Sequence, residues 1–281
     1  MKNSVRSIQR RLTGKPTTEG AGVHLTRIFA HGDVEAMDPF LLLDDFSSPD
    51  PADHIKGFPW HPHRGIETVT YMLKGEVEHQ DSLGNKGIIG PGDVQWMTAG
   101  GGIIHQEMPR YSKTGIAGMQ LWVNLPRADK MTAPQYRGIT VSEVPVVSTK
   151  GVEVAVLSGV YEGTEGPCKG LFVDVRYLGV GFLGEGAFTY DVPEHFTAFV
   201  YVREGTVYVG DEPVHEKTCA VLTNDASRIE VRSDSMPPHC IVVAGEPIGE
   251  PVAWGGPVVM NTEEELRKAF EDIENGTFVQ G

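Results

Sequence analysis

The chain has 281 residues, with 24 Lys and Arg against 38 Asp and Glu, and its formal net charge is −14 at pH 7. A charge of this sign repels the phosphate backbone, so we expect no direct binding of nucleic acid. Hydrophobic residues make up 40% of the chain and charged residues 22%, which is usual for a globular protein of one or two domains. No stretch approaches the roughly 20 apolar residues of a membrane span. We therefore expect no membrane partner and a cytoplasmic location, or a nuclear one in a eukaryotic cell.

Glycine and proline punctuate the chain at short intervals, with 34 Gly and 19 Pro spread along it. Between them lie short runs that are rich in β-branched and aromatic residues, a pattern that favours an all-β sandwich or barrel. The first half has such runs at 23–29, 68–73, 87–89, 94–98 and 118–125. The second half has them at 152–157, 171–177, 198–202, 206–209, 229–231 and 240–244.

The segment 57–67, GFPWHPHRGIE, is the first that indicates chemistry. Residues i and i+2 of a β-strand face the same side, so His61 and His63 can converge on one point. The segment His105-Gln106-Glu107 has the same spacing and can supply another imidazole and a carboxylate. These ligands suit a divalent transition metal, and the lack of a thiolate in both motifs argues against a Cys-rich structural zinc site. The residues therefore predict a metal pocket in the first half.

After Leu125-Pro126 the run 127–137 is polar and irregular. We therefore place the link between two domains within 126–150, with an N-terminal metal-binding barrel at 1–135 and a C-terminal barrel at 136–281. The two halves are similar to a diverged repeat, because a shift of 130 residues sets 68–75, TVTYMLKG, on 198–205, AFVYVREG. At this shift the residues His61, His63 and Glu67 fall on Asp191, Pro193 and Thr197. We expect only the first half to bind metal, and we expect no functional role for His195.

The cysteines of the second half, Cys168, Cys219 and Cys240, are odd in number and widely spaced. This usage predicts reduced thiols in a reducing compartment. His239 precedes Cys240 directly, but neighbouring residues of a strand face opposite sides. A buried structural thiol is therefore favoured over a nucleophile.

A helix is predicted near the end of the chain. The sequence Thr262-Glu263-Glu264-Glu265 has the pattern of a capping box, and Gly276 is a typical stop signal. Between them, Leu266, Phe270 and Ile273 share one helical face. We expect this short helix to pack its apolar stripe on a barrel and to take no part in chemistry.

Several long segments resemble the signature of the pirin family, two-domain members of the cupin superfamily. These segments are 57–68, 90–100 and 102–109. The segments 125–126, 129–131, 245–247, 256–257 and 260–262 are similar to the linker and C-terminal part of that family. The resemblance runs through most of the chain. It implies an all-β bicupin of two face-to-face antiparallel β-barrels, each a double-stranded β-helix, with a short C-terminal helix and one divalent ion in the N-terminal barrel.

Carried over position by position, the pirin ligands fall on His61, His63, His105 and Glu107. The general cupin pattern instead uses the Glu that follows the His pair, which is Glu67 here. Spacing leaves both carboxylates open, and we follow the pirin set and give Glu67 a place beside the ligands or in the pocket. The expected neighbours of the site are Arg64, Trp60 and Trp96, with a packing role for both tryptophans.

The resemblance implies two classes of function. Some pirins are quercetin 2,3-dioxygenases, which open a flavonol with O₂ and release carbon monoxide, and here Glu107, or Glu67, would take the hydroxyl proton. The metal would be Fe(II), with Mn, Ni, Cu, Co or Zn as alternatives. The other class is a non-catalytic, metal- or redox-responsive regulator that binds a protein partner. The fold alone does not separate the two.

Overall fold

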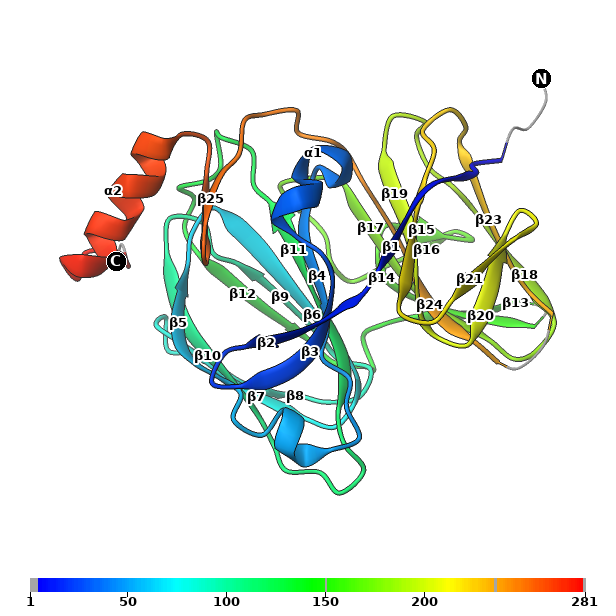
Figure 1. The fold of residues 1–281 in the computed structure, drawn as a ribbon, viewed down its shortest axis with the longest axis horizontal. Helices are drawn as coiled ribbons and strands as arrows, with labels where there is room; N and C mark the ends of the chain where they lie inside the picture. Colours follow the sequence, from blue (N-terminus) through cyan, green and yellow to red (C-terminus); the bar gives the residue numbers. More distant parts are fainter. Residues whose placement is uncertain (1–4, 150, 235–236, 280–281) are drawn as a thin grey trace. The chain divides into compact units, whose positions relative to one another are not determined.

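A computed structural model describes residues 5–149, 151–234 and 237–279, and strands dominate it (Figure 1). The chain folds into two compact units. Unit N consists of 16–141 and the chain from Ile248 onward, and unit C consists of 142–247 and the segment up to Lys15. The division between the two main spans falls after Val141. The segment up to Lys15 precedes the main span of unit N but belongs to unit C, and the segment from Ile248 follows the main span of unit C but belongs to unit N. The predicted boundary between 135 and 136 stays a prediction.

Two antiparallel sheets form the body of unit N, in addition to the hairpin of β25 (Ala253–Gly255) and β26 (Val258–Met260). The seven-stranded sheet has the order β12-β9-β6-β11-β4-β3-β2, and the four-stranded sheet has the order β5-β10-β7-β8. The strands are β2 (Lys15–Glu19), β3 (Val23–Phe29), β4 (Phe40–Asp45), β5 (Phe58–His63), β6 (Ile66–Lys74), β7 (Val77–Asp81), β8 (Lys86–Ile89), β9 (Val94–Thr98), β10 (Ile103–Pro109), β11 (Ala117–Asn124) and β12 (Gln135–Ile139). The short helices are η1 (His31–Asp33), α1 (Val34–Met37) and η2 (Pro51–Asp53).

Unit C repeats this arrangement strand for strand. Its sheets have the orders β1-β22-β19-β24-β17-β14-β13 and β18-β23-β20-β21. The strands are β1 (Ile8–Thr13), β13 (Val146–Thr149), β14 (Val152–Ser158), β17 (Val175–Phe182), β18 (Gly186–Asp191), β19 (Thr197–Glu204), β20 (Thr206–Val209), β21 (Glu212–His215), β22 (Thr218–Leu222), β23 (Arg228–Ser233) and β24 (His239–Gly245), with a hairpin of β15 (Val160–Tyr161) and β16 (Thr164–Glu165). Strands β6 and β19 hold the same place in their sheets, which confirms the predicted repeat. The predicted all-β bicupin with a C-terminal helix is also confirmed.

The stretch within which the link between domains is expected also contains strands. The stretch 126–150 contains two edge strands, β12 in unit N and β13 in unit C. Strand β12 is polar because it lies at the edge of its sheet, so the sequence Gln135-Tyr136-Arg137-Gly138-Ile139 lacks the alternation that identifies an inner strand. In unit C the same edge position is filled by β1, from the start of the chain.

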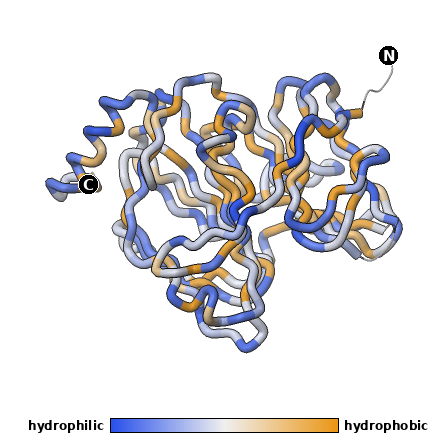
Figure 2. Tube along the Cα trace, in the orientation of Figure 1, coloured by the Kyte–Doolittle hydropathy of each residue, from blue (hydrophilic) through white to orange (hydrophobic). Residues whose placement is uncertain are grey.

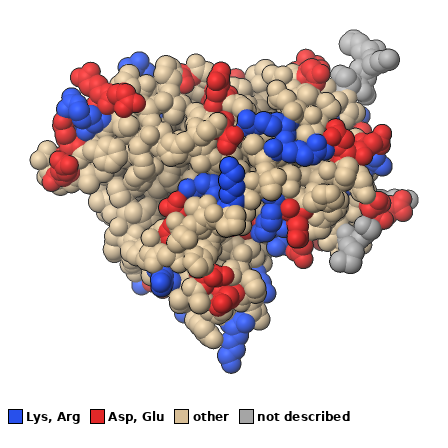
Figure 3. Space-filling model, viewed as in Figure 1, with Lys and Arg blue, Asp and Glu red and all other residues tan. Residues whose placement is uncertain are grey.

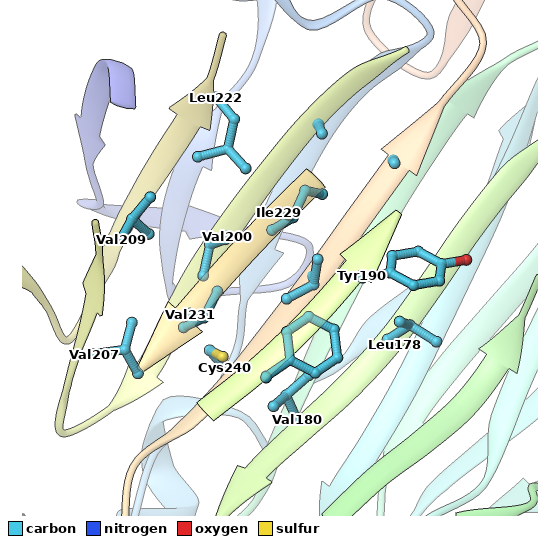
Figure 4. Close-up of a cluster of buried hydrophobic side chains, with 14 of the residues drawn as sticks. Leu178, Val180, Tyr190, Val200, Val207, Val209, Leu222, Ile229, Val231 and Cys240 are labelled. Atoms are coloured by element: carbon cyan, nitrogen blue, oxygen red, sulfur yellow. The ribbon is translucent and has the colours of Figure 1, made fainter. Parts of the chain in front are cut away.

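Hydrophobic residues are concentrated along the strands of both units (Figure 2). In unit C they fill the space between the sheets, where apolar side chains of β18, β20 and β23 meet those of the larger sheet (Figure 4). All three cysteines are buried and none is in a disulfide, and burial raises the pKa of the Cys240 thiol to about 12. A thiol with so high a pKa is a poor nucleophile, in agreement with a structural role.

Two buried cations anchor the C-terminal segment to the metal motif in unit N. Arg64 donates to the carbonyls of Gly101 and Phe278 at 2.8 and 2.9 Å and pairs with Asp272 at 2.8 Å. The Lys130 ammonium donates to the carbonyls of Gly65 and Val259 at 2.9 and 3.0 Å. Gly65 has a φ of +79°, and a Cβ there would overlap the Val259 oxygen. These contacts explain why Arg-Gly follows the two histidines.

Helix α2 (Glu263–Glu274) begins with the predicted capping box at Thr262. It packs on the hairpin of β25 (Ala253–Gly255) and β26 (Val258–Met260) within unit N (Figure 1). Its buried face consists of Leu266, Ala269 and Asp272. Phe270, predicted on the buried face, is 38% exposed, whereas Asp272, which pairs with Arg64, is buried.

The helices of the described residues are all too short or too polar to cross a membrane. On the face shown in Figure 3, Lys and Arg side chains lie interspersed with Asp and Glu. A surface of mixed charge with a net charge of −14 does not favour a polyanionic partner.

Candidate metal centre

The four-stranded sheet of unit N brings the three predicted histidines together. His61 and His63 project from β5, and His105 from β10, where it pairs directly with His61. The ring centroids of His61 and His105 are 4.3 Å apart, and that of His63 lies 4.8 Å from the first and 5.0 Å from the second. The three side chains form a group whose ligand atoms all lie within 4.8 Å of one another. The arrangement can hold a metal ion.

Backbone carbonyls fix two of the imidazoles. Nδ1 of His61 donates to the carbonyl of Pro59 at 2.8 Å, and Nδ1 of His63 donates to that of Pro257 at 3.2 Å. Each ring therefore carries its proton on Nδ1 and has its lone pair on Nε2, as in metal-bound histidines oriented by a carbonyl. Nε2 of His63 and both ring nitrogens of His105 are buried and have no hydrogen-bond partner among the described residues. A divalent ion would satisfy these atoms.

The charge state of the rings suits metal binding. Burial lowers the pKa of His63 and of His105 well below 6.5, and the neighbouring imidazoles lower each further. Both rings are neutral at neutral pH, and the neutral imidazole is the form that donates a lone pair to a metal.

Glu107 is buried two residues beyond His105 on the same face of β10. Its Oε2 accepts a hydrogen bond from Gln120 Nε2 at 2.9 Å, and its Oε1 accepts weaker ones from Thr70 at 3.3 Å and Gln95 at 3.4 Å. Trp122 Nε1 donates to Gln120 Oε1 at 3.1 Å, which fixes the orientation of the amide. The carboxylate is thus held by donors from three strands of the larger sheet.

His79 lies beside these residues and was not predicted from the sequence. This residue lies on β7 directly opposite Glu107 and is fully buried. Its ligand atom, with those of His105 and Glu107, forms a second group within 4.8 Å. The sequence His79-Gln80-Asp81 has the same i, i+2 spacing as the recognised motifs, and this signal could have identified it.

The structure does not bring Glu67 to this group. Glu67 lies on β6 opposite Thr98, whose hydroxyl donates to it at 2.7 Å. Thr70 lies three residues after Glu67 on β6 and lines the cavity described below. Residues an odd number apart on a strand face opposite sides, so Glu67 lies on the other face of β6. Burial raises the pKa of Glu67, and the hydrogen bond from Thr98 and the charge of Arg137 oppose this shift.

The expected neighbours take different places. Arg64 anchors the C-terminal segment, as described above. Trp96 is buried on the same face of the sheet as Glu67. Trp60 lines the cavity and is 53% exposed. The packing role expected for both tryptophans thus fits Trp96 and not Trp60.

A cavity of about 540 Å³ in unit N reaches His61, His63 and Glu107. This volume lies in the range of small-molecule sites, which is roughly 300–1,000 Å³. Its apolar wall includes Leu25, Leu42, Phe46, Phe58, Trp122 and Trp254. Its polar wall includes Gln120 and the ion pair of Arg27 with Asp44, whose atoms lie 2.8 Å apart.

Unit C has no equivalent site among its described residues, which include no group of three His, Cys, Asp or Glu side chains able to hold a metal. Its corresponding strands carry apolar side chains inward (Figure 4). His195 is exposed, and its Nε2 lies 3.8 Å from a carboxylate oxygen of Glu246.

Comparison with known proteins gives the same picture over the whole chain. The family pattern described as Pirin matches residues 22–123, and that of the Pirin C-terminal cupin domain matches residues 178–279. A pirin-like protein of Caulobacter vibrioides is 44% identical over 98% of this chain and 99% of its own length. Pirin of Mus musculus is 41% identical over 92% of this chain and 89% of its own.

A solved structure named quercetin 2,3-dioxygenase, from Acinetobacter baumannii, superimposes with a TM-score of 0.90 and is 32% identical. The match covers 99% of this chain and 100% of that one. Both halves of the chain, its length and its fold agree with these relatives, and the chain belongs to the pirin family.

Proposed function

We propose that the protein is a metal-dependent dioxygenase of the pirin type, which opens flavonols such as quercetin with O₂ and releases carbon monoxide. One observation carries the proposal: a largely apolar cavity of about 540 Å³ reaches His61, His63 and the Glu107 carboxylate. The name of the Acinetobacter relative supports the same reaction. In that reaction two carbon–carbon bonds of the heterocycle break, one carbon leaves as carbon monoxide, and both atoms of O₂ enter the remaining ester.

In this proposal His61, His63, His105 and Glu107 hold one divalent ion. Three imidazoles and a carboxylate suit Fe(II), and also Mn, Ni, Co, Cu or Zn. When bound, such an ion supplies a Lewis acid that polarises the oxygen atoms of a substrate.

The walls of the cavity bind and orient the substrate. Phe58, Trp122 and Trp254 offer flat apolar surfaces for aromatic rings, and they exclude water from the inner end. Trp60, with its exposed indole, can cover a ring that projects toward solvent. A flavonol has the flat aromatic shape that such walls accept.

Glu107 accepts the proton of the substrate hydroxyl, which makes the ring system electron-rich toward O₂. Its carboxylate lines the cavity and is oriented by Gln120. We assign no direct step to Glu67, because it lies on the opposite face of β6 from the cavity-lining Thr70. Its role in the proposal is to support the sheet that carries the donors to Glu107.

The test is to add quercetin under air to the Fe(II)-loaded protein and to follow the long-wavelength absorbance of the flavonol. The proposal predicts loss of this absorbance by the native protein and not by a His61→Ala variant. A native protein that holds its metal and leaves quercetin intact with every divalent ion named above would contradict the proposal. That result would favour a regulatory pirin that binds a protein partner.

A further inference from the structure

We propose that His79, with His105 and Glu107, forms a second position for the metal ion in unit N. The ion that His61, His63, His105 and Glu107 hold in the proposed function is held there instead, with His105 and Glu107 shared by both positions. This inference rests on the metal site proposed above. The ligand atoms of its three residues all lie within 4.8 Å of one another, the same limit that the first group meets.

The environment of His79 is that of a metal ligand. The side chain is fully buried, and its Nδ1 has no hydrogen-bond partner within the described part of the chain. Its Nε2 lies 3.3 Å from Oδ2 of Asp81. A carboxylate behind an imidazole fixes the orientation of the ring, and this arrangement is common behind metal-bound histidines.

Asp81 is itself fixed in place. Its Oδ1 accepts from the backbone amides of Leu83 and Asn85, and its Oδ2 accepts from Asn85 Nδ2, all at 2.9 Å. The carboxylate therefore cannot rotate freely, and it holds the far side of the His79 ring. The His79 ring also lies close to that of His105, and the two ring centroids are 5.4 Å apart.

Unit C shows what the position looks like without a ligand role. The shift of 130 residues sets His79 on Val209, and the cross-strand partner of Val209 is Val231, just as the partner of His79 is Glu107. Both valines belong to the apolar interior of unit C (Figure 4). The repeat thus folds with two valines where unit N has an imidazole and a carboxylate. A buried polar atom is costly unless it is hydrogen-bonded or coordinates a metal, so the Nδ1 of His79, unpartnered among the described residues, indicates a ligand at this position.

A purely structural role for His79 is the competing explanation. Its ring stacks on Tyr136 with centroids 4.7 Å apart and 23° between the planes. Stacking on Tyr136 would stabilise the ring, and the hydrogen bond to Asp81 would satisfy its Nε2. A purely structural role would weaken Co(II) binding by a similar factor whether or not His61 is present. A ligand of the second position alone would weaken binding mainly in the His61→Ala background, so the effect of His79→Gln in the two backgrounds separates the explanations.

The experiment titrates Co(II) into four proteins and records affinity, stoichiometry and visible spectrum. They are the native chain, His61→Ala, His79→Gln and the double variant. Gln at position 79 keeps a hydrogen-bond donor toward Asp81. We expect His61→Ala to keep one equivalent of Co(II) at lower affinity and with a changed spectrum. The double variant should bind at least about tenfold more weakly than His61→Ala, a change of the size seen when a metal site loses a supporting group.

Two controls keep the result interpretable. His79→Phe, in the same His61→Ala background, retains a ring against Tyr136 but offers no ligand atom, and it should behave as the Gln variant does. His31→Gln removes a cavity histidine that belongs to neither group. It should leave Co(II) binding unchanged.

Equal affinity and equal spectra for His61→Ala and the double variant would overturn the proposal, and so would complete loss of Co(II) from His61→Ala. The readout needs no flavonol turnover. A native protein without dioxygenase activity would therefore contradict the proposed function and leave this test unaffected.

Discussion

Gln120 connects the aromatic wall of the cavity to the carboxylate of the site. Its Nε2 donates to Glu107 Oε2 at 2.9 Å, and its Oε1 accepts from Trp122 Nε1 at 3.1 Å. Because the indole can only donate, the amide has one orientation, with its NH₂ toward Glu107. Trp122 also meets the His63 ring edge to face, with centroids 5.0 Å apart. The Gln120 side chain thus positions Glu107, a proposed metal ligand.

Replacement of Gln120 by Leu should weaken metal binding by about tenfold to a hundredfold, because Glu107 loses its shortest hydrogen bond. Titration of the metal-free protein with Co(II) measures the change. Gln106→Leu is the matched control, since the Gln106 side chain donates to Gln80 on the neighbouring strand and not to the site. Equal affinities of the Gln120 variant and the native protein would show that the bond does not support the ligand.

Removal of His61 should lower the metal affinity sharply while the fold stays assembled. The side chain is partly exposed at the cavity, and little packing is lost when it is replaced by Ala. Metal analysis of the purified protein together with circular dichroism tests this. His195→Ala should retain native metal content. A His61→Ala protein with native metal content and affinity would exclude His61 from the site.

The two acids should differ in their effects. Glu107→Gln removes the negative charge from the cavity, so it should abolish turnover and alter the Co(II) spectrum. Glu67→Gln keeps an acceptor for the Thr98 hydroxyl outside the cavity, and it should do less of each. Turnover rates and spectra of both variants decide the matter. Metal loss in the Glu67 variant beside an undisturbed Glu107 variant would instead support the general cupin pattern.

Acid should destabilise the metal-free protein, because the pKa of His63 and of His105 lies well below 6.5 in the fold. Between the lowered pKa and 6.5 the unfolded chain binds more protons than the folded one. The free energy of unfolding therefore rises with pH in this window and falls as the pH drops below 6.5.

Urea titrations of the chelated protein at about pH 7.5 and about pH 5.5 measure this effect, on either side of the ordinary histidine pKa. The His105→Gln variant should show a smaller difference between the two pH values. His24→Gln, at an exposed position, should show the native difference. The same free energy of unfolding for the native protein at both values would contradict the assignment of neutral rings.

The histidines of the site could be predicted because their spacing alone fixes their direction. His61 and His63 lie two apart on one strand, so any strand geometry sends them to the same face. His105 was identified in the same way. Residue spacing does not predict which strands become neighbours in the sheet. His79 joins the group only because β7 pairs with β10, and that pairing is a long-range property of the sheet.

Register explains the other differences. Glu67 follows the histidine motif closely, but β6 belongs to the other sheet, and its register with β9 puts Glu67 beside Thr98. Strand β12 was expected to be linker because an edge strand needs few apolar residues. The repeat was accessible from the sequence, since β6 and β19 are inner strands and keep their hydrophobic pattern.

The most direct test of the proposed dioxygenase is the fate of isotopically labelled oxygen. Fe(II)-loaded protein is given quercetin under ¹⁸O₂, and mass spectrometry follows the ester and the released gas. We predict an ester that carries both heavy atoms, together with unlabelled carbon monoxide in equal amount, and neither product from the His61→Ala or the His105→Ala protein. An ester without label, or quercetin consumed without carbon monoxide, would contradict the proposed reaction.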